Sequence, residues 1–150
     1  MPITYTGVGK PALAEPHTTL HFNVTHTDGL ALIALARRPV GIDIERIRPV
    51  SDPEGLVGRF FSAAERESYL ALPAELRPAG FFRGWTCKEA VIKAAGLSVA
   101  YLDGFDVELN PLCPAALLAA RHPVLAGMGL GLAAWEPAGG YAAAVAIEGA

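Results

Sequence analysis

The sequence is poor in cysteine and has no excess of positive charge, and each shortage excludes a class of protein. Its two cysteines, Cys87 and Cys113, have neither zinc-ligand nor redox-pair spacing, so we expect both to be reduced. Its 12 Lys and Arg residues against 15 Asp and Glu residues give a formal charge of -3. No global positive field is therefore available for nucleic acid or for an anionic membrane.

Long apolar runs are also missing. The longest, "LALIALA" and "LAGMGLGLAAW", are much shorter than the roughly 20 residues that a membrane-spanning helix needs. The N-terminus lacks a basic start followed by an apolar run, which excludes a signal peptide. We therefore expect a cytoplasmic protein with no membrane partner. Its 150 residues, 52% of them hydrophobic, suffice for the core of one domain, or of one domain plus part of another.

The basic residues that are present cluster in the middle of the chain. Ten of the 12 lie between Arg37 and Lys93, with Lys10 and Arg121 outside that stretch. A local concentration of this kind, in a chain of negative net charge, predicts that the middle faces an anionic ligand or partner.

Periodicity and turn signals predict an α+β fold. Residues 20–36 read as a hairpin around Asp28-Gly29, and residues 129–147 read as a second hairpin. Residues 40–47 alternate between apolar and acidic side chains, as a strand does. We expect the strand at 40–45 to pair with strands near 104–109 and 129–147 in an antiparallel sheet.

Helix signals fall between these strands. Asp52 is a candidate N-cap for a helix to about Phe61, and Ser62 with Glu65 forms a capping box for the next helix. The stretch 79–95 reads as a longer helix that ends before Gly96. We expect this long helix to pack across the sheet, whereas residues 111–123 read as an irregular or partly helical connection.

Acidic side chains on the strand and the long helix form the main candidate site. Asp43 and Glu45 project to the same side of their strand, and Glu89 shares a helix face with Lys93 and Trp85. Taken separately, the strand pair reads as a solvated face and Glu89–Lys93 as an ordinary surface ion pair. Taken together among apolar neighbours, three carboxylates predict a magnesium site, since Mg²⁺ prefers oxygen ligands and completes its shell with phosphates.

Two further residues have no settled role from their positions alone. Lys88 lies about 100° round the helix from Glu89, at the edge of the acidic face. His26 precedes the Asp28-Gly29 turn, where it could donate to a phosphate or serve as an ordinary turn residue.

Four motifs in order carry a resemblance to a known family. They are "GKP" at 9–11, "FNVTHT" at 22–27, "GIDIE" at 41–45 and "WTCKEAVIK" at 85–93. The chain thus resembles the 4′-phosphopantetheinyl transferase superfamily, in its larger Sfp-like type, over nearly its whole length. That resemblance implies transfer of the phosphopantetheine arm of coenzyme A to a serine of an acyl, peptidyl or polyketide carrier protein, with Mg²⁺ and release of adenosine 3′,5′-bisphosphate.

The resemblance also implies roles for individual residues. Asp43, Glu45 and Glu89 match metal-binding acids, and Glu89 also matches the proposed general base. Lys93 matches a lysine that contacts the CoA pyrophosphate and assists the leaving group, so Glu89 and Lys93 are the expected catalytic pair. The remaining positions that match CoA-binding residues are Lys10, Thr25 and His26.

The order of the motifs implies a two-half architecture. Residues 1–39 match the terminal hairpin of a first half and residues 40–150 match the second half, so most of the first half is expected to be missing. A self-associating chain would cover the surface left by that half. Two alternatives stay open: a non-catalytic remnant that binds CoA or a carrier protein without transfer, and a magnesium-dependent phosphohydrolase, which no nucleophile or water-orienting motif supports.

Overall fold

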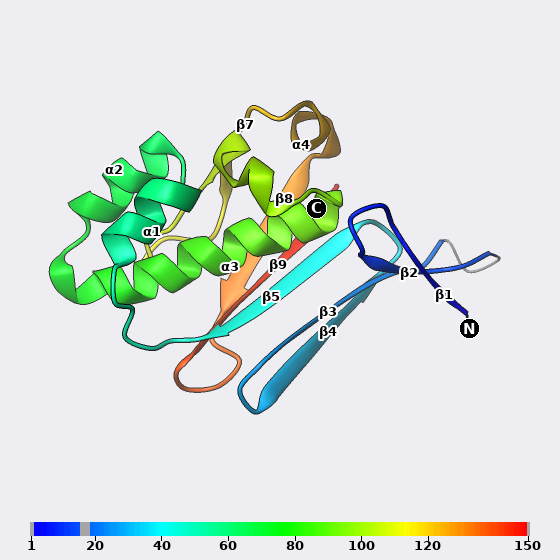
Figure 1. The fold of residues 1–150 in the computed structure, drawn as a ribbon, viewed down its shortest axis with the longest axis horizontal. Helices are drawn as coiled ribbons and strands as arrows, with labels where there is room; N and C mark the ends of the chain where they lie inside the picture. The colour runs from blue at the N-terminus through cyan, green and yellow to red at the C-terminus, as the bar shows by residue number, and fades with distance from the viewer. Residues whose placement is uncertain (1, 16–18, 150) are drawn as a thin grey trace.

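The protein is described by a computed structural model that covers residues 2–15 and 19–149. It is an α+β fold in which one long helix lies across a layer of strands (Figure 1). The elements, in chain order, are β1 (Ile3–Tyr5), β2 (Pro11–Leu13), β3 (His21–Thr27), β4 (Leu30–Ala36), β5 (Val40–Arg46), α1 (Pro53–Phe60), α2 (Ala63–Ala71), α3 (Arg77–Ala95), β6 (Phe105–Val107), β7 (Leu117–Ala120), α4 (Pro123–Met128), β8 (Leu130–Trp135) and β9 (Tyr141–Glu148).

The central sheet confirms one predicted pairing and corrects the other. β5 pairs antiparallel with β9, which pairs with β8, so the C-terminal hairpin joins β5 as expected. The prediction that β5 also pairs with a strand near 104–109 is wrong, because β6 pairs with β7 in a separate sheet. Residues 111–123 accordingly contain a strand, β7, where an irregular or partly helical connection was expected.

The second edge of β5 is occupied by side chains of β3. The amide of Ile42 donates to Oδ1 of Asn23 at 2.8 Å, and the amide of Ile44 donates to Oγ1 of Thr25 at 3.3 Å. Residues 23 and 25 meet 42 and 44 in the same order, so β3 and β5 run in the same direction. Since these side chains satisfy the amides that a further strand would need, β6 has no free edge to join.

Helices α1, α2 and α3 begin and end where the sequence predicts, with one difference, whereas α4 lies where the sequence predicts no helix. Asp52 caps α1, the Ser62–Glu65 capping box opens α2, and Gly96 ends α3 with a left-handed φ of 69°. Helix α3 begins at Arg77, earlier than predicted, because Pro78 lies in its first turn, where a missing amide costs no intrahelical hydrogen bond.

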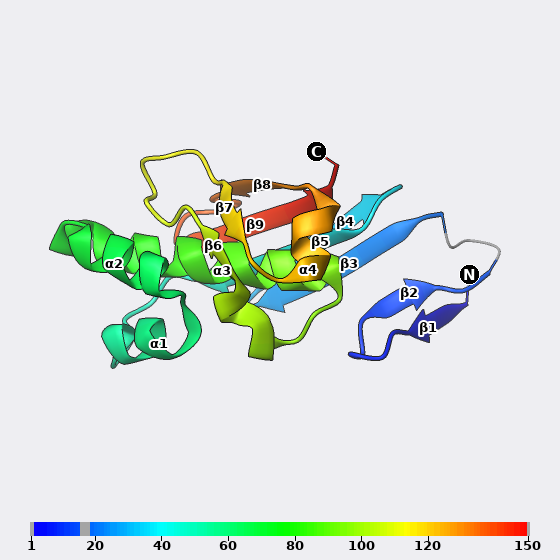
Figure 2. The same cartoon turned by 90° about the horizontal axis from the view of Figure 1, so that it is seen from above.

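Two groups of buried side chains hold α3 against the sheet. The larger includes Val91, Ile92, Phe105 and Leu125, and the smaller gathers the aromatic side chains around Phe81 under α1 and α2. Val91 and Ile92 are buried, whereas Trp85 is only half-buried. Figure 2 shows the β1–β2 hairpin near the C-terminal end of α3, at the opposite end of the molecule from α1 and α2. Among the described residues, no helix is both long and apolar enough to span a bilayer.

Candidate functional site

The candidate site lies where β5 and α3 pack backbone against backbone. Gly41 allows this approach, because a side chain there would collide with the carbonyl of Ala90 and the amide of Ala94. At the other end of the contact, Glu45 and Trp85 line the same pocket. The strand and the helix therefore run past each other in opposite directions.

This arrangement keeps two rows of side chains in step. Two residues along a strand advance about 6.8 Å, and four residues along a helix advance about 6 Å. Asp43 and Glu45 on β5 consequently lie opposite the row formed by Trp85, Glu89 and Lys93 on α3. The acidic strand and the helix motif thus meet in one place.

Asp43 is the most buried acid of this group, with 5% of its surface exposed. Its Oδ1 accepts hydrogen bonds from Nζ of Lys93 at 2.9 Å and from Oγ1 of Thr25 at 3.3 Å. Its Oδ2 has no partner, and it is the one buried side-chain oxygen or nitrogen within residues 2–15 and 19–149 for which this holds. Buried polar atoms are nearly always satisfied, so this oxygen lacks a partner that a bound cation could supply.

Burial and like charge act together on these carboxylates. The pKa of Asp43 is raised to about 7, mainly by burial and partly by the charges of Glu89 and Glu45, against the opposing effect of Lys93. Burial also raises the pKa of Glu89, with Lys93 opposing and Glu45 adding to the shift. The charges of the three acids therefore disfavour one another, a situation that a bound cation would relieve.

The donor chemistry of these residues fits magnesium, although they form no complete cage. Over the part of the chain that is described, no three His, Cys, Asp or Glu side chains are grouped closely enough to hold a metal ion. Magnesium sites commonly use one or two carboxylates and take their other ligands from water and substrate phosphates. The unpartnered Oδ2 of Asp43 suits this mode, and Asp43, Glu45 and Glu89 stay a prediction as metal ligands.

Lys93 bonds to Asp43, Lys10 bonds to the backbone of Lys93, and both lysines use most of their N–H donors within the protein. Nζ of Lys93 donates to the Ile42 carbonyl at 3.0 Å as well as to Asp43, which leaves one N–H for a ligand. Nζ of Lys10 donates to the carbonyls of Val40 at 2.9 Å and Lys93 at 2.6 Å. Both side chains line a pocket of about 250 Å³. Two ammonium groups therefore border this pocket, and that of Lys93 is bonded to Asp43.

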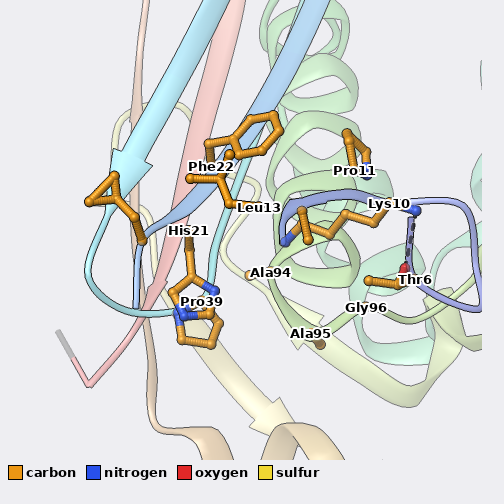
Figure 3. A pocket seen from close by; sticks show the side chains of 12 residues that line it. Thr6, Lys10, Pro11, Leu13, His21, Phe22, Pro39, Ala94, Ala95 and Gly96 are labelled. Atoms are coloured by element: carbon orange, nitrogen blue, oxygen red, sulfur yellow. Dashed lines mark hydrogen bonds between the residues drawn. The ribbon is translucent and has the colours of Figure 1, made fainter. Parts of the chain in front are cut away.

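A second pocket adjoins Lys10 on the side of the β1–β2 hairpin. It has a volume of about 270 Å³, and Figure 3 shows Lys10, Leu13, His21 and Pro39 around it with the end of α3. Its lining is mainly apolar, and the backbone amide of Lys10 is held by Thr6 at 3.1 Å. Lys10 therefore lies between the two cavities, and its ammonium group links the β1–β2 hairpin to β5 and α3.

Thr25 and His26 occupy opposite faces of β3. Thr25 is buried and bonds to Asp43, so it can act on a ligand through that carboxylate. His26 is exposed and points the other way, because successive side chains of a strand alternate. The structure thus gathers Lys10, Thr25, Asp43 and Lys93 at the site, and it places His26 apart from them.

Sequence reasoning missed Asn23, and the structure gives Arg48 and Lys88 contacts that the sequence did not indicate. Asn23 anchors β5 as Thr25 does, and the polar alternation of Asn23, Thr25 and Thr27 along β3 was the available signal. Arg48 lies 3.5 Å from Glu45, in an aromatic pocket of about 230 Å³. Lys88, expected at the edge of the acidic face, is instead fully buried.

The raised pKa of Asp43 predicts how stability depends on pH without metal. The folded pKa of about 7 lies above the unfolded value of 3.8, so the folded protein binds this proton more tightly. The free energy of unfolding should therefore fall as pH rises between the unfolded and folded pKa values. Measured from about pH 5 to about pH 8, the fall should be roughly 2 to 3 kcal/mol. Urea unfolding in chelator should show this loss in the wild type and much less of it in Asp43→Asn; equal losses would contradict the assignment.

Comparisons with known proteins agree with this geometry. Residues 39–145 match the family model described as the 4′-phosphopantetheinyl transferase superfamily. The chain is 44% identical over 116 residues to the 4′-phosphopantetheinyl transferase HetI of Nostoc sp., covering 75% of this chain and 49% of that protein. It is 34% identical over 103 residues to the transferase Sfp of Bacillus subtilis, covering 68% of this chain and 45% of that protein.

A solved structure supports the fold. Holo-[acyl-carrier-protein] synthase of Thermotoga maritima aligns with a TM-score of 0.58 and 19% sequence identity, over 73% of this chain and 62% of that one. The chain spans about half the length of the curated relatives it matches.

Proposed function

This chain belongs to the 4′-phosphopantetheinyl transferase superfamily, and from that premise we propose that it transfers the phosphopantetheine arm of coenzyme A to a serine of a carrier protein. The serine oxygen forms a bond to the phosphorus that carries the pantetheine. The bond from that phosphorus to the bridging oxygen breaks, and adenosine 3′,5′-bisphosphate leaves. The carrier is an acyl, peptidyl or polyketide carrier protein.

One observation carries the proposal. Asp43 has a buried, unpartnered oxygen beside a lysine with a free donor, on a strand and helix that bear the family's acids. Mg²⁺ held by Asp43, Glu45 and Glu89 would neutralise charge on the pyrophosphate oxygens, which is the main need of phosphoryl-type transfer. The remaining N–H of Lys93 can donate to the same oxygens.

The proposed base is Glu89. Burial raises the pKa of this carboxyl, and a base becomes more effective as its pKa approaches the working pH. It lies in the row that faces β5, on the same helix face as Lys93. Its role is to accept the proton of the carrier serine as the new bond forms.

The co-substrate would lie along Lys10 and Lys93. The pocket of about 250 Å³ that they line also borders Gly9, Asn23 and Val24. Two ammonium groups there favour the anionic end of CoA. Thr25 contributes by holding Asp43, and His26 is proposed to reach the 3′-phosphate from the exposed face of β3.

The assay that tests the function measures the carrier itself. The purified chain is mixed with CoA, Mg²⁺ and an apo carrier protein, and mass spectrometry follows the gain of one phosphopantetheinyl group. We expect conversion by the wild type, and loss of at least about 100-fold in rate for Glu89→Gln, since general-base assistance is worth that much. CoA binding with no transfer would favour the alternative of a binding protein.

The domain division and the compartment remain part of this proposal. Residues 1–39 are assigned to the end of a first half and residues 40–150 to the transferase domain; the family match at 39–145 begins close to that boundary. Cys87 and Cys113 are both free thiols, as cysteines are in proteins of the reducing cytoplasm. We therefore propose that the protein acts in the cytoplasm.

Self-association is proposed through the outer face of the β3–β4 hairpin. Val24 and Ile33 are opposite each other across the two strands and are 43% and 71% exposed, and Leu35 on the same face is 66% exposed. A second copy that covers this face would remove three large aliphatic side chains from water. Light scattering should find an oligomer that Ile33→Glu dissociates and that Leu112→Glu, at a distant exposed leucine, leaves intact; a wild-type monomer would contradict it.

A further inference from the structure

Lys88 carries the one fully buried ammonium group in the described chain, and the function proposed above gives it no task. Its Nζ donates to Oε1 of Glu65 at 2.7 Å and to the carbonyl of Phe105 at 2.8 Å. The same nitrogen lies 4.0 Å from the centre of the Phe105 ring. The hydrogen-bond partners of this charge are therefore supplied by α2 and β6, and Asp106 and Arg121 also act on it.

Glu65 is bound as tightly as its partner. Its Oε1 also accepts from the amide of Ser62 at 2.8 Å, and its Oε2 accepts from the amide of Val107 at 2.7 Å. One carboxylate thus joins the first turn of α2 to β6 and, through Lys88, to α3. Figure 2 shows β6 passing beside α3, which is where this junction lies.

A buried ion pair is a poor device for stability alone. Desolvation of two charges offsets most of their attraction, and well-packed apolar side chains of similar size are often as stabilising. What distinguishes a buried ion pair is that its hydrogen bonds depend on distance and angle and so hold in only one geometry, whereas apolar side chains can slide past one another and keep contact. The pair therefore fixes the rotation of α3 about its own axis more sharply than the surrounding core does.

The rotation of α3 decides where the acidic row points. Lys88 and Glu89 are consecutive, about 100° apart on a helix whose side chains extend roughly 5–6 Å from its axis. A turn of about 20° would carry the Glu89 carboxylate by about 2 Å relative to Asp43. Displacements of about 1 Å can cost a site 100-fold.

We propose that Lys88 is a positioning residue, whose buried bridge to Glu65 and the Phe105 carbonyl sets the rotation of α3 and so aims Glu89 and Lys93 at Asp43. The effect of Lys88 on catalysis rests on the proposed function, whereas its effect on the rotation of α3 rests on the bridge alone. Lys88 touches neither substrate nor metal.

The experiment compares three variants in a Trp135→Phe background, where Trp85 on α3 is the sole tryptophan. Lys88→Met removes the bridge, and Glu65→Gln with Lys88→Met removes it without leaving a buried charge, should the single variant fail to fold. Val91→Ala is the matched control, because it truncates another fully buried side chain of α3 and leaves the bridge intact. The readouts are Trp85 fluorescence without ligand and affinity for Mn²⁺ by electron paramagnetic resonance.

We expect loss of the bridge to shift the Trp85 emission and to weaken Mn²⁺ binding by about tenfold or more, as supporting partners of metal ligands do. Val91→Ala should lower the melting temperature without either change. Unchanged fluorescence and Mn²⁺ affinity in folded bridge variants would overturn the proposal, and so would a control that reproduces both changes. A wild type that binds no Mn²⁺ would refute the proposed metal site, and the Trp85 measurement would then decide the positioning role by itself.

Discussion

Asp43→Ala should abolish Mg²⁺-dependent binding of CoA while the protein stays folded. Asp43 is the acid whose Oδ2 lacks a partner, and its other oxygen holds Lys93. Loss of a charged contact of this kind weakens binding by roughly 1.5–3 kcal/mol, or about ten- to 100-fold, and the misplacement of Lys93 adds to this. The fold survives because burial and two neighbouring carboxylates already disfavour the ionised form of Asp43.

Thermal melts provide the measurement. The wild type should melt higher with Mg²⁺ and CoA together than with either alone, and Asp43→Ala should lose that gain. Glu67→Ala, which removes an exposed carboxylate of α2, serves as the control and should behave as the wild type. A wild-type melt that is indifferent to Mg²⁺ in the presence of CoA would count against the site.

Gly41→Ala should destabilise the fold more than any other single-methyl change we predict. The added carbon would collide with the carbonyl of Ala90 and the amide of Ala94, and it would lie 2.9 Å from Cβ of Lys93. Backbone atoms inside a helix cannot rotate away, so α3 must move off β5 and separate Asp43 from Lys93. We expect a cost of more than about 3 kcal/mol and a melting temperature lowered by roughly 10 °C.

Gly58→Ala provides the matched control. Gly58 is an exposed residue of α1, and a side chain there meets nothing within 4 Å, so alanine should be neutral or stabilising. Circular dichroism melts of both variants decide the matter. A Gly41→Ala protein that melts within about 2 °C of the wild type would mean that the close approach of β5 and α3 is not required.

Only part of the site could be predicted from the sequence. Spacing alone placed Asp43 beside Glu45 and Glu89 beside Lys93, because the strand and helix periods are properties of the local backbone. Which side chains then meet depended on how the elements pack. Lys93 pairs with Asp43 across 50 positions of the chain, and Thr25 reaches the same oxygen from β3. His26, grouped with Thr25 by the motif, lies on the other face.

The sequence by itself determined the ends of α1 and α2, the C-terminal end of α3 and the β3–β4 turn. Asp52, the Ser62–Glu65 box and Gly96 act within one turn of their own helix, and Gly29, with a φ of 74°, closes the β3–β4 turn locally. These features depend on backbone conformation and on hydrogen bonds between near neighbours, so they are visible without a fold.

Tertiary structure decided which edges pair and which charges are buried. β6 was expected beside β5, but Asn23 and Thr25 bind the amides of that edge, so β6 pairs with β7. Helical geometry placed Lys88 at the edge of the acidic face, and only the fold shows that it is buried, with its charge satisfied by Glu65 and the Phe105 carbonyl. A strand edge or a buried ammonium group pairs with whichever segment lies next to it in the fold. Which distant segment that is cannot be predicted from local sequence patterns.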